Sequence, residues 1–228
     1  MSPLIPFMIP FLLAAPDSPL SDYAQKHITM TDDSTSTKRQ CWFPLESNPS
    51  LMNSYIAKIG FDTSLYELTD VFSTESWALD MIPQPVASVI MLYPLTDVQE
   101  EHRRSEQVSP APDDVWFMKQ RIGNACGTIG LLHALLNAPK GLRTVSILPD
   151  SWLHSFYQDC PAPLSPVAKA ERLEGDSTIK TLHDQATSDE TNQTSRGSLE
   201  DNVITHFVAL VHVNGGLYEL DGRKDGPV

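Results

Sequence analysis

The sequence has few cysteines and histidines, and their spacing argues against a metal site. Its three cysteines, Cys41, Cys126 and Cys160, form no CxxC pair, and its seven histidines form no HxxxH pair. A small, odd number of cysteines also argues against a disulfide framework and favours a reducing compartment. We therefore expect no structural metal, no disulfide scaffold and no cofactor.

Basic residues are also scarce. Sixteen lysines and arginines stand against 29 aspartates and glutamates, which gives a formal net charge of −13. Such a protein repels the phosphate backbone, so we expect no nucleic-acid partner, and its field attracts a basic partner instead. The charge alone does not identify that partner.

A strong targeting signal is missing from the N-terminus. Residues 1–16 are apolar, but they contain no lysine or arginine and are interrupted by prolines at positions 3, 6 and 10. They make a weak signal peptide and are too short to span a bilayer as a helix. We interpret residues 1–40 as a disordered extension, with Met30 as an alternative start. We expect a cytoplasmic protein without a membrane anchor, and secretion is the less favoured alternative.

Aromatic side chains are absent from residues 158–206, and residues 174–202 are rich in Ser, Thr, Asp and Asn. A segment of this composition buries too little apolar area to offset the entropy of ordering the chain. We therefore predict a long mobile loop over about residues 160–202.

Three patterns predict regular structure. "SNPSLMNSYIAKIG" predicts a helix capped by Ser47 or Asn48, with Pro49 in its first turn and Gly60 at its end. The apolar run 87–95 predicts a strand buried on both faces. "HFVALVHV" and "LYEL" flank an Asn-Gly pair, which predicts a β-hairpin.

Cys126 lies at the start of another predicted helix, with Asn124 as its N-cap and Pro139 after its end. The partial positive charge at a helix N-terminus favours a thiolate over a thiol. The small neighbours Gly123 and Gly127 would let a substrate backbone approach the sulfur. A lone cysteine is more often a small buried apolar residue, so its partners decide the interpretation.

A thiol nucleophile needs an imidazole to take its proton and a third group to orient that imidazole. If Asn214 and Gly215 form a two-residue turn, Asp221 lies diagonal to His206 on one face of the hairpin, within reach of its imidazole. Gln120, six residues before Cys126, is a candidate donor to the oxyanion of a tetrahedral intermediate.

Two other histidines are poorer candidates. His212 lies deeper in the predicted hairpin strand than His206, and His133 lies seven residues beyond Cys126, about 10 Å along its helix. We interpret both as packing or surface residues.

The stretches "WFPLESNP", "VWFMKQRIGNACGTIGLLHALLN" and "HFVALVHVNGGLYELDGRK" resemble the ubiquitin C-terminal hydrolases, thiol peptidases that free ubiquitin from small adducts at its carboxyl end. The resemblance covers roughly residues 41–228, and the short members of the family look closest. It implies that Cys126 is the nucleophile, His206 the general acid/base, Asp221 its orienting partner and Gln120 the oxyanion donor.

The same resemblance implies a fold. Residues 41–228 would form one α/β (α+β) catalytic domain of the papain-like type, with helices around a central, mainly antiparallel sheet and a knotted path. The predicted loop over about 160–202 would cross over the active site, so that only small leaving groups pass. Contacts with ubiquitin would come from Pro44, Leu45, Glu46, Ser47, Asn48 and Pro49.

The expected partner is the C-terminal tail of ubiquitin, with ubiquitin-like modifiers as further candidates, and we expect a monomer. An alternative function follows from a difference between this sequence and the short members of the family. Short members of the family continue beyond the "LDGRK" segment with a helix and a sheet strand that this chain lacks, which favours a catalytically weak ubiquitin-binding protein. A third alternative is a generic papain-like protease that acts on unfolded peptides.

Overall fold

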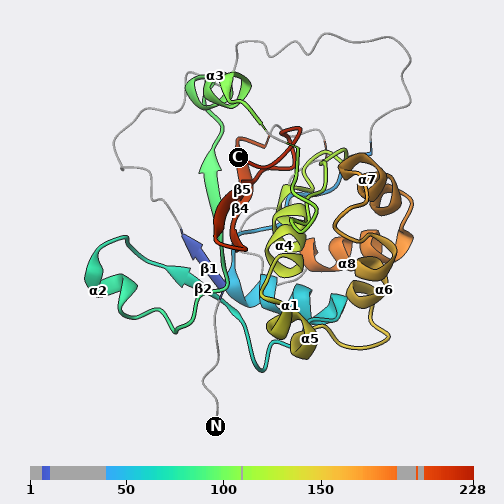
Figure 1. Ribbon diagram of the computed structural model, residues 1–228, viewed down its shortest axis with the longest axis horizontal. Coiled ribbons are helices and arrows are strands. Elements are labelled where there is room, and N and C mark those ends of the chain that lie inside the picture. Colours follow the sequence, from blue (N-terminus) through green and yellow to red (C-terminus); the bar gives the residue numbers. More distant parts are fainter. Residues whose placement is uncertain (1–6, 11–39, 109, 189–198, 200–202) are drawn as a thin grey trace.

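Helices lie mainly to one side of a β-sheet in the computed structural model, which describes residues 7–10, 40–108, 110–188, 199 and 203–228 (Figure 1). The strands are β1 (Phe7–Pro10), β2 (Leu68–Val71), β3 (Ser88–Pro94), β4 (Thr205–Val213) and β5 (Gly216–Leu220). The helices are α1 (Pro49–Ile59), α2 (Ser76–Leu79), α3 (Asp97–Ser105), α4 (Cys126–Leu136), α5 (Lys140–Ser146), α6 (Trp152–Asp159), α7 (Pro166–Glu174) and α8 (Ser177–Thr187). No helix of the described residues is long and apolar enough to cross a membrane.

The sheet has the strand order β2-β1-β3-β4-β5. Its two longest ladders, β3–β4 and β4–β5, are antiparallel, whereas β1 runs parallel to both of its neighbours. The predicted hairpin is confirmed, because Val213 pairs with Gly216 across a turn in which Asn214 and Gly215 both have positive φ. Two positive φ values are what the favoured two-residue turn requires.

The predicted first helix is confirmed as α1. Asn48 rather than Ser47 is the N-cap, and its side-chain oxygen accepts from the backbone N–H groups of Ser50 and Leu51 at 3.0 and 3.3 Å. Pro49 occupies the first turn, where its missing N–H costs nothing. Gly60 ends the helix with a φ of +108°, which only glycine adopts readily.

The prediction of a doubly buried strand at 87–95 is half wrong. The strand forms as β3, but only Ser88 and Ile90 are buried. Both lie on the face covered by α4, where a methyl group added at Gly130 would approach Ile90 at 3.9 Å. The alternate residues are partly exposed, because the described helices lie mainly on one side of the sheet (Figure 1).

The predicted mobile loop over 160–202 is wrong for much of its length, because α7 and α8 occupy it. Ser165 and Asp176 cap the two helices through their side chains. Both helices bury aliphatic residues at helical spacing, so the lack of aromatics did not prevent packing; the buried aliphatic side chains are Ala170, Leu173, Ile179 and Ala186. Residues 189–198 and 200–202 of the predicted loop lie outside the described residues.

The predicted disorder of residues 1–40 is wrong for β1. Phe7 pairs with Leu68 of β2, and Met8 pairs with both Thr69 of β2 and Val89 of β3. Pairing satisfies the backbone groups that β2 and β3 would otherwise leave as open edges. The rest of the predicted extension, apart from Gln40, lies outside the described residues.

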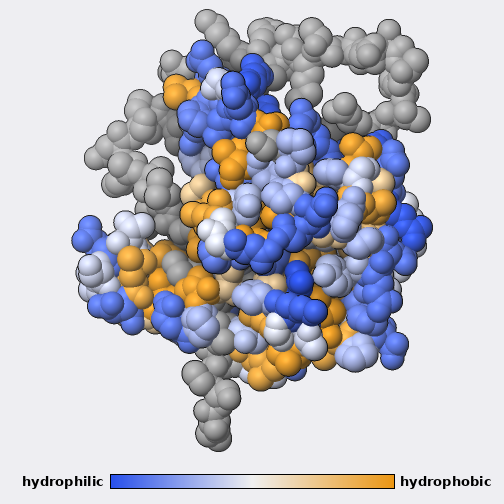
Figure 2. All heavy atoms as spheres, viewed as in Figure 1, coloured by the Kyte–Doolittle hydropathy of each residue, from blue (hydrophilic) through white to orange (hydrophobic). Residues whose placement is uncertain are grey.

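Apolar residues also reach the surface at several places, one of which is the projecting segment that carries α2 (Figure 2). There Phe72, Trp77 and Met81 are 69%, 62% and 64% exposed. Exposed apolar patches can mediate association between proteins, so the expected monomer stays a prediction.

Candidate active site

Cys126 is the first residue of α4 and is 7% exposed. The prediction that Asn124 caps this helix is wrong. The N-cap is Ala125, which has no side-chain oxygen, and Asn124 instead has a φ of 60° and directs its amide Nδ2 to the Cys41 sulfur at 3.4 Å. No side chain therefore caps the N–H groups in the first turn of α4, beside Cys126.

The loop before Cys126 is held by the segment that precedes α1. Gly123 donates its N–H to the Gln40 carbonyl, and Trp42 donates to the Gly123 carbonyl, both at 2.9 Å. The space beside the glycines is filled, because an added methyl at Gly123 would lie 3.0 Å from the Cys41 sulfur. At Gly127 it would lie 2.9 Å from Leu45 Cβ. These glycines thus admit the protein's own chain, which corrects the prediction that they make room for a substrate.

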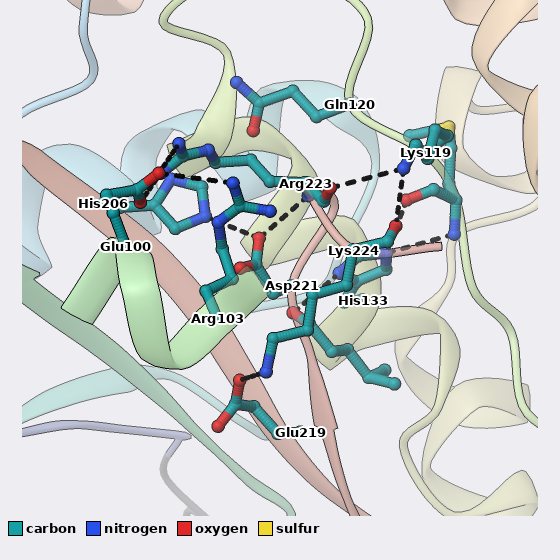
Figure 3. Close-up of polar contacts among 12 residues, drawn as sticks. Glu100, Arg103, Lys119, Gln120, His133, His206, Glu219, Asp221, Arg223 and Lys224 are labelled. Atoms are coloured by element: carbon teal, nitrogen blue, oxygen red, sulfur yellow. Dashed lines mark hydrogen bonds and ion pairs between the residues drawn. The ribbon is translucent and has the colours of Figure 1, made fainter. Parts of the chain in front are cut away.

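His206 and Asp221 come together as the hairpin register predicted (Figure 3). The two side chains are 3% and 0% exposed, and His206 Nε2 lies 2.7 Å from Asp221 Oδ1. The same carboxylate oxygen accepts the backbone N–H of Arg223 at 2.8 Å. Cys126 is the other side chain near enough to His206 to act on its imidazole, and it raises the pKa of that group.

The electrostatics of this cluster favour a charged imidazole. Burial lowers the pKa of His206, but hydrogen bonds with Asp221 and with Cys126 outweigh burial and raise that pKa to about 9. Burial raises the pKa of Asp221, yet its hydrogen bond and charge attraction with His206 hold that pKa below the ordinary value. A paired carboxylate and imidazolium with a sulfur nearby are suited to nucleophilic catalysis.

Gln120 is fixed against the turn that carries Asp221. Its backbone N–H donates to the Gly222 carbonyl at 2.7 Å, and a methyl added at Gly222 would lie 2.9 Å from Gln120 Cβ. One side-chain N–H donates to the Ile122 carbonyl at 3.1 Å. The second N–H of the amide is the candidate oxyanion donor.

Sequence reasoning missed the ion pairs that hold residues 221–225. The Arg223 guanidinium binds both carboxylate oxygens of Glu100 in α3 at 2.7 Å, and Lys224 binds Glu219 at 2.7 Å (Figure 3). Lys224 also pairs with Glu106. Burial raises the pKa of Glu100, but hydrogen bonds with Arg223 and Arg103 outweigh burial and lower it. No local signal could have paired Arg223 with Glu100, because 123 residues separate them.

His133 and His212, which we interpreted as packing or surface residues, lie in such positions. His212 is exposed, and His133 is fully buried. The His133 ring stacks on Phe117, its Nδ1 donates to the Leu220 carbonyl at 3.2 Å, and its Nε2 accepts the backbone N–H of Met118 at 3.1 Å. Burial lowers the pKa of His133 to about 4, which suits a neutral packing residue.

The predicted ubiquitin-contact segment, residues 44–49, is only partly available to a partner. Leu45 is 4% exposed and packs toward Gly127, and the Asn48 side chain caps α1. Pro44, Glu46 and Ser47 are partly exposed. Leu45 is therefore corrected to a core residue.

The described residues contain no cluster of three side chains that could hold a metal. A cavity of about 430 Å³ lies between residues 108–113 and the start of α7, and Cys126 does not line it. The candidate site brings together the side chains of Cys126, His206, Asp221 and Gln120.

Comparison with known proteins agrees with this geometry. Residues 42–228 match the family described as ubiquitin carboxyl-terminal hydrolase, family 1. Ubiquitin carboxyl-terminal hydrolase 3 of Arabidopsis thaliana is 40% identical over 200 residues, which cover 86% of this chain and 81% of the relative. The ubiquitin carboxyl-terminal hydrolase of Aplysia californica is 37% identical over 191 residues, which cover 83% of this chain and 85% of the relative.

A solved structure is also similar, the Trichinella spiralis UCH37 catalytic domain bound to ubiquitin vinyl methyl ester. Its TM-score is 0.58 at 26% identity, and the match covers 82% of this chain and 77% of that one. Since the sequence match spans nearly all of residues 41–228 and the fold agrees, this chain belongs to the ubiquitin carboxyl-terminal hydrolase family 1 and is a cysteine-type hydrolase.

Proposed function

We propose that this protein is a thiol-dependent deubiquitinating hydrolase that releases small adducts or peptides from the C-terminal glycine of ubiquitin. One observation carries the assignment of roles. His206 Nε2 lies 2.7 Å from Asp221 Oδ1, and Cys126, at the N-terminus of α4 without a side-chain cap, is near enough to His206 to help raise the pKa of its imidazole. Cys126 is the nucleophile, His206 the general acid/base and Asp221 the group that orients the imidazole.

The reaction then follows in two steps. The Cys126 thiolate attacks the carbonyl carbon of the terminal glycine, and the resulting oxyanion accepts N–H groups from the Cys126 backbone and the Gln120 amide. The His206 imidazolium gives its proton to the leaving amine as the carbon–nitrogen bond breaks, which leaves a thioester. Water, deprotonated by His206, attacks the thioester and releases the ubiquitin carboxylate and the Cys126 thiol.

Substrate recognition follows from charge and exposure. The tail of ubiquitin carries arginines before its Gly-Gly end, and a protein with a net charge of −13 attracts it. We assign the contact to the partly exposed members of residues 44–49, which lie beside the α4 N-terminus because Leu45 packs toward Gly127. The preference for small leaving groups rests on the family resemblance. Three free cysteines support a cytoplasmic enzyme.

Covalent capture tests this function. Ubiquitin that carries a C-terminal vinyl methyl ester should label the purified chain once, and peptide mapping should find the adduct on Cys126. The Cys126→Ala variant should bind ubiquitin without being labelled. Binding of ubiquitin by the wild type without labelling would instead identify a catalytically weak ubiquitin-binding protein. Cleavage of unfolded casein without labelling would favour a generic protease.

We expect Gln120→Ala to lower kcat for a fluorogenic ubiquitin C-terminal amide by about 10²-fold with little change in KM, because an oxyanion donor acts mainly in the transition state. Gln107→Ala, on the short segment after α3, serves as the matched control and should keep wild-type kcat. A higher KM with an unchanged kcat in Gln120→Ala would contradict the oxyanion role. Steady-state kinetics of the three proteins separate these outcomes.

A further inference from the structure

A line of buried hydrogen bonds connects α1, α4 and α8 to the segment before α1. The Tyr55 hydroxyl lies 3.1 Å from Thr128 Oγ1, and Thr128 Oγ1 lies 2.9 Å from His183 Nδ1. His183 Nε2 lies 2.7 Å from the carbonyl oxygen of Phe43. The side chains of Tyr55, Thr128 and His183 are fully buried.

The chemistry of these partners fixes the position of each proton. A carbonyl oxygen can only accept, so His183 Nε2 must carry a proton and donate it to the Phe43 carbonyl. In the neutral imidazole Nδ1 is then an acceptor, and it receives the Thr128 hydroxyl proton. The Tyr55 hydroxyl in turn donates to Thr128 Oγ1.

Aromatic neighbours hold the His183 ring in place. The Trp42 ring lies against it with a centroid distance of 4.6 Å, and the Tyr55 ring meets it edge-on at 6.1 Å. A buried ring packed on two sides and bonded through both nitrogens keeps one orientation. Its Nε2–H therefore points at the Phe43 carbonyl in a fixed direction.

The Phe43 carbonyl belongs to the planar peptide bond that joins Phe43 to Pro44. Because that bond is planar, holding its oxygen also sets the direction in which the chain enters residues 44–49. The far end of this segment is fixed at Asn48, the N-cap of α1, and its middle is fixed by Leu45 packing toward Gly127. His183 thus supplies the first of three anchors.

We infer that His183 is a positioning residue for ubiquitin binding, which holds the Phe43 carbonyl so that the partly exposed residues Pro44 and Glu46 stand in one binding conformation. This inference rests on the proposed function. The hydrogen bond from His183 to Phe43 affects the affinity for ubiquitin rather than the reactivity of Cys126. Thr128 lies two residues after Cys126 in α4, about 200° around the helix, so its side chain faces away from the sulfur.

Two amide substitutions separate the two hydrogen bonds of the His183 ring, the one from Nε2 to Phe43 and the one between Nδ1 and Thr128. In His183→Gln the amide nitrogen can reach the place of Nε2 and still donate to Phe43, whereas in His183→Asn the amide can replace only Nδ1 and still bond Thr128. We expect His183→Gln to bind ubiquitin within about threefold of wild type. His183→Asn should bind at least about tenfold more weakly, because the Phe43 carbonyl loses the hydrogen bond that fixes its direction.

Calorimetric titration with ubiquitin measures this difference, and the rate of Cys126 alkylation by iodoacetamide measures the nucleophile independently. Alkylation should stay within about twofold of wild type in both variants. The same two substitutions at His154, which lies in α6 and contacts Gln158, should change neither quantity. Thr128→Val removes the hydrogen bond to His183 Nδ1 but keeps the bond from Nε2 to Phe43, so it should keep wild-type affinity for ubiquitin.

Several results would overturn the inference. Equal affinities of the Asn and Gln variants would do so, as would alkylation that falls in step with affinity. If His183→Asn does not fold, a loss of affinity of about tenfold or more in His183→Gln or Thr128→Val decides against the inference, because both variants keep the hydrogen bond to Phe43, and affinity within about threefold of wild type in both supports it. A wild-type protein that does not bind ubiquitin at all would instead refute the proposed function.

Discussion

Replacement of Cys126 by serine is expected to lower kcat for hydrolysis of a ubiquitin C-terminal amide by about 10⁴-fold or more, the scale on which loss of a nucleophile acts. A serine hydroxyl ionises far less readily than a thiol, so the helix N-terminus and His206 would not generate an alkoxide in its place. Ten thousandfold corresponds to about 5.4 kcal/mol of transition-state stabilisation. Fluorogenic assays at saturating substrate measure the loss.

Cys41→Ser is the matched control for this experiment. Cys41 is a partly exposed free thiol, so the same atom is exchanged at a position to which we assign no role in catalysis. Its variant should retain kcat within about threefold of wild type. The ubiquitin affinity of Cys126→Ser should also be retained, because the exchange is small. More than one per cent of wild-type turnover in purified Cys126→Ser would contradict the assignment of the nucleophile.

The second large effect is expected for Asp221→Asn. An asparagine can accept from His206 but cannot supply the negative charge that stabilises the imidazolium, so kcat should fall on the order of 10³-fold. The buried position of both side chains strengthens the effect, since no solvent replaces the lost charge. The loss should appear in kcat and in kcat/KM alike.

The pH profile distinguishes this mechanism from simple misfolding. Acylation needs a protonated His206, so activity is lost as pH rises through the pKa of that group. Since the pKa of His206 is raised to about 9, the alkaline limb of the wild-type profile should lie near pH 9. Removing the Asp221 charge removes a cause of the raised pKa, so the limb should move to lower pH.

Asp225→Asn is the matched control, because Asp225 is an exposed carboxylate of the same turn and pairs with Lys119 at 2.5 Å. It should keep both the wild-type kcat and the position of the alkaline limb. An Asp221→Asn profile that superimposes on the wild-type profile after scaling would show that the carboxylate does not set the protonation of His206.

Local patterns predicted the elements that carry the site. The cap of α1 and its first-turn proline, the helix that begins at Cys126, and the turn at Asn214 all depend on interactions between residues close in sequence. The hairpin register alone brought Asp221 beside His206, because a two-residue turn fixes which residues face each other.

Predictions from residue type and composition were wrong where tertiary packing determined the local structure. The stretch that became α7 and α8 has no aromatic residue, yet aliphatic side chains at helical spacing gave it a buried face. Asn124 is a good capping residue by type, but the backbone turns to positive φ there and its amide contacts Cys41 instead. In both cases tertiary contacts outweighed a local preference.

By itself the sequence determined the chemistry of the reacting groups and the short-range geometry of the hairpin, because turns and caps involve neighbours along the chain. Only the tertiary structure decided that His206 reaches Cys126, that Glu100 holds Arg223, and that His183 holds Phe43 across 140 residues. The physical reason is that burial of α4 brings distant segments together, and those contacts depend on the packing of the whole core rather than on any local pattern.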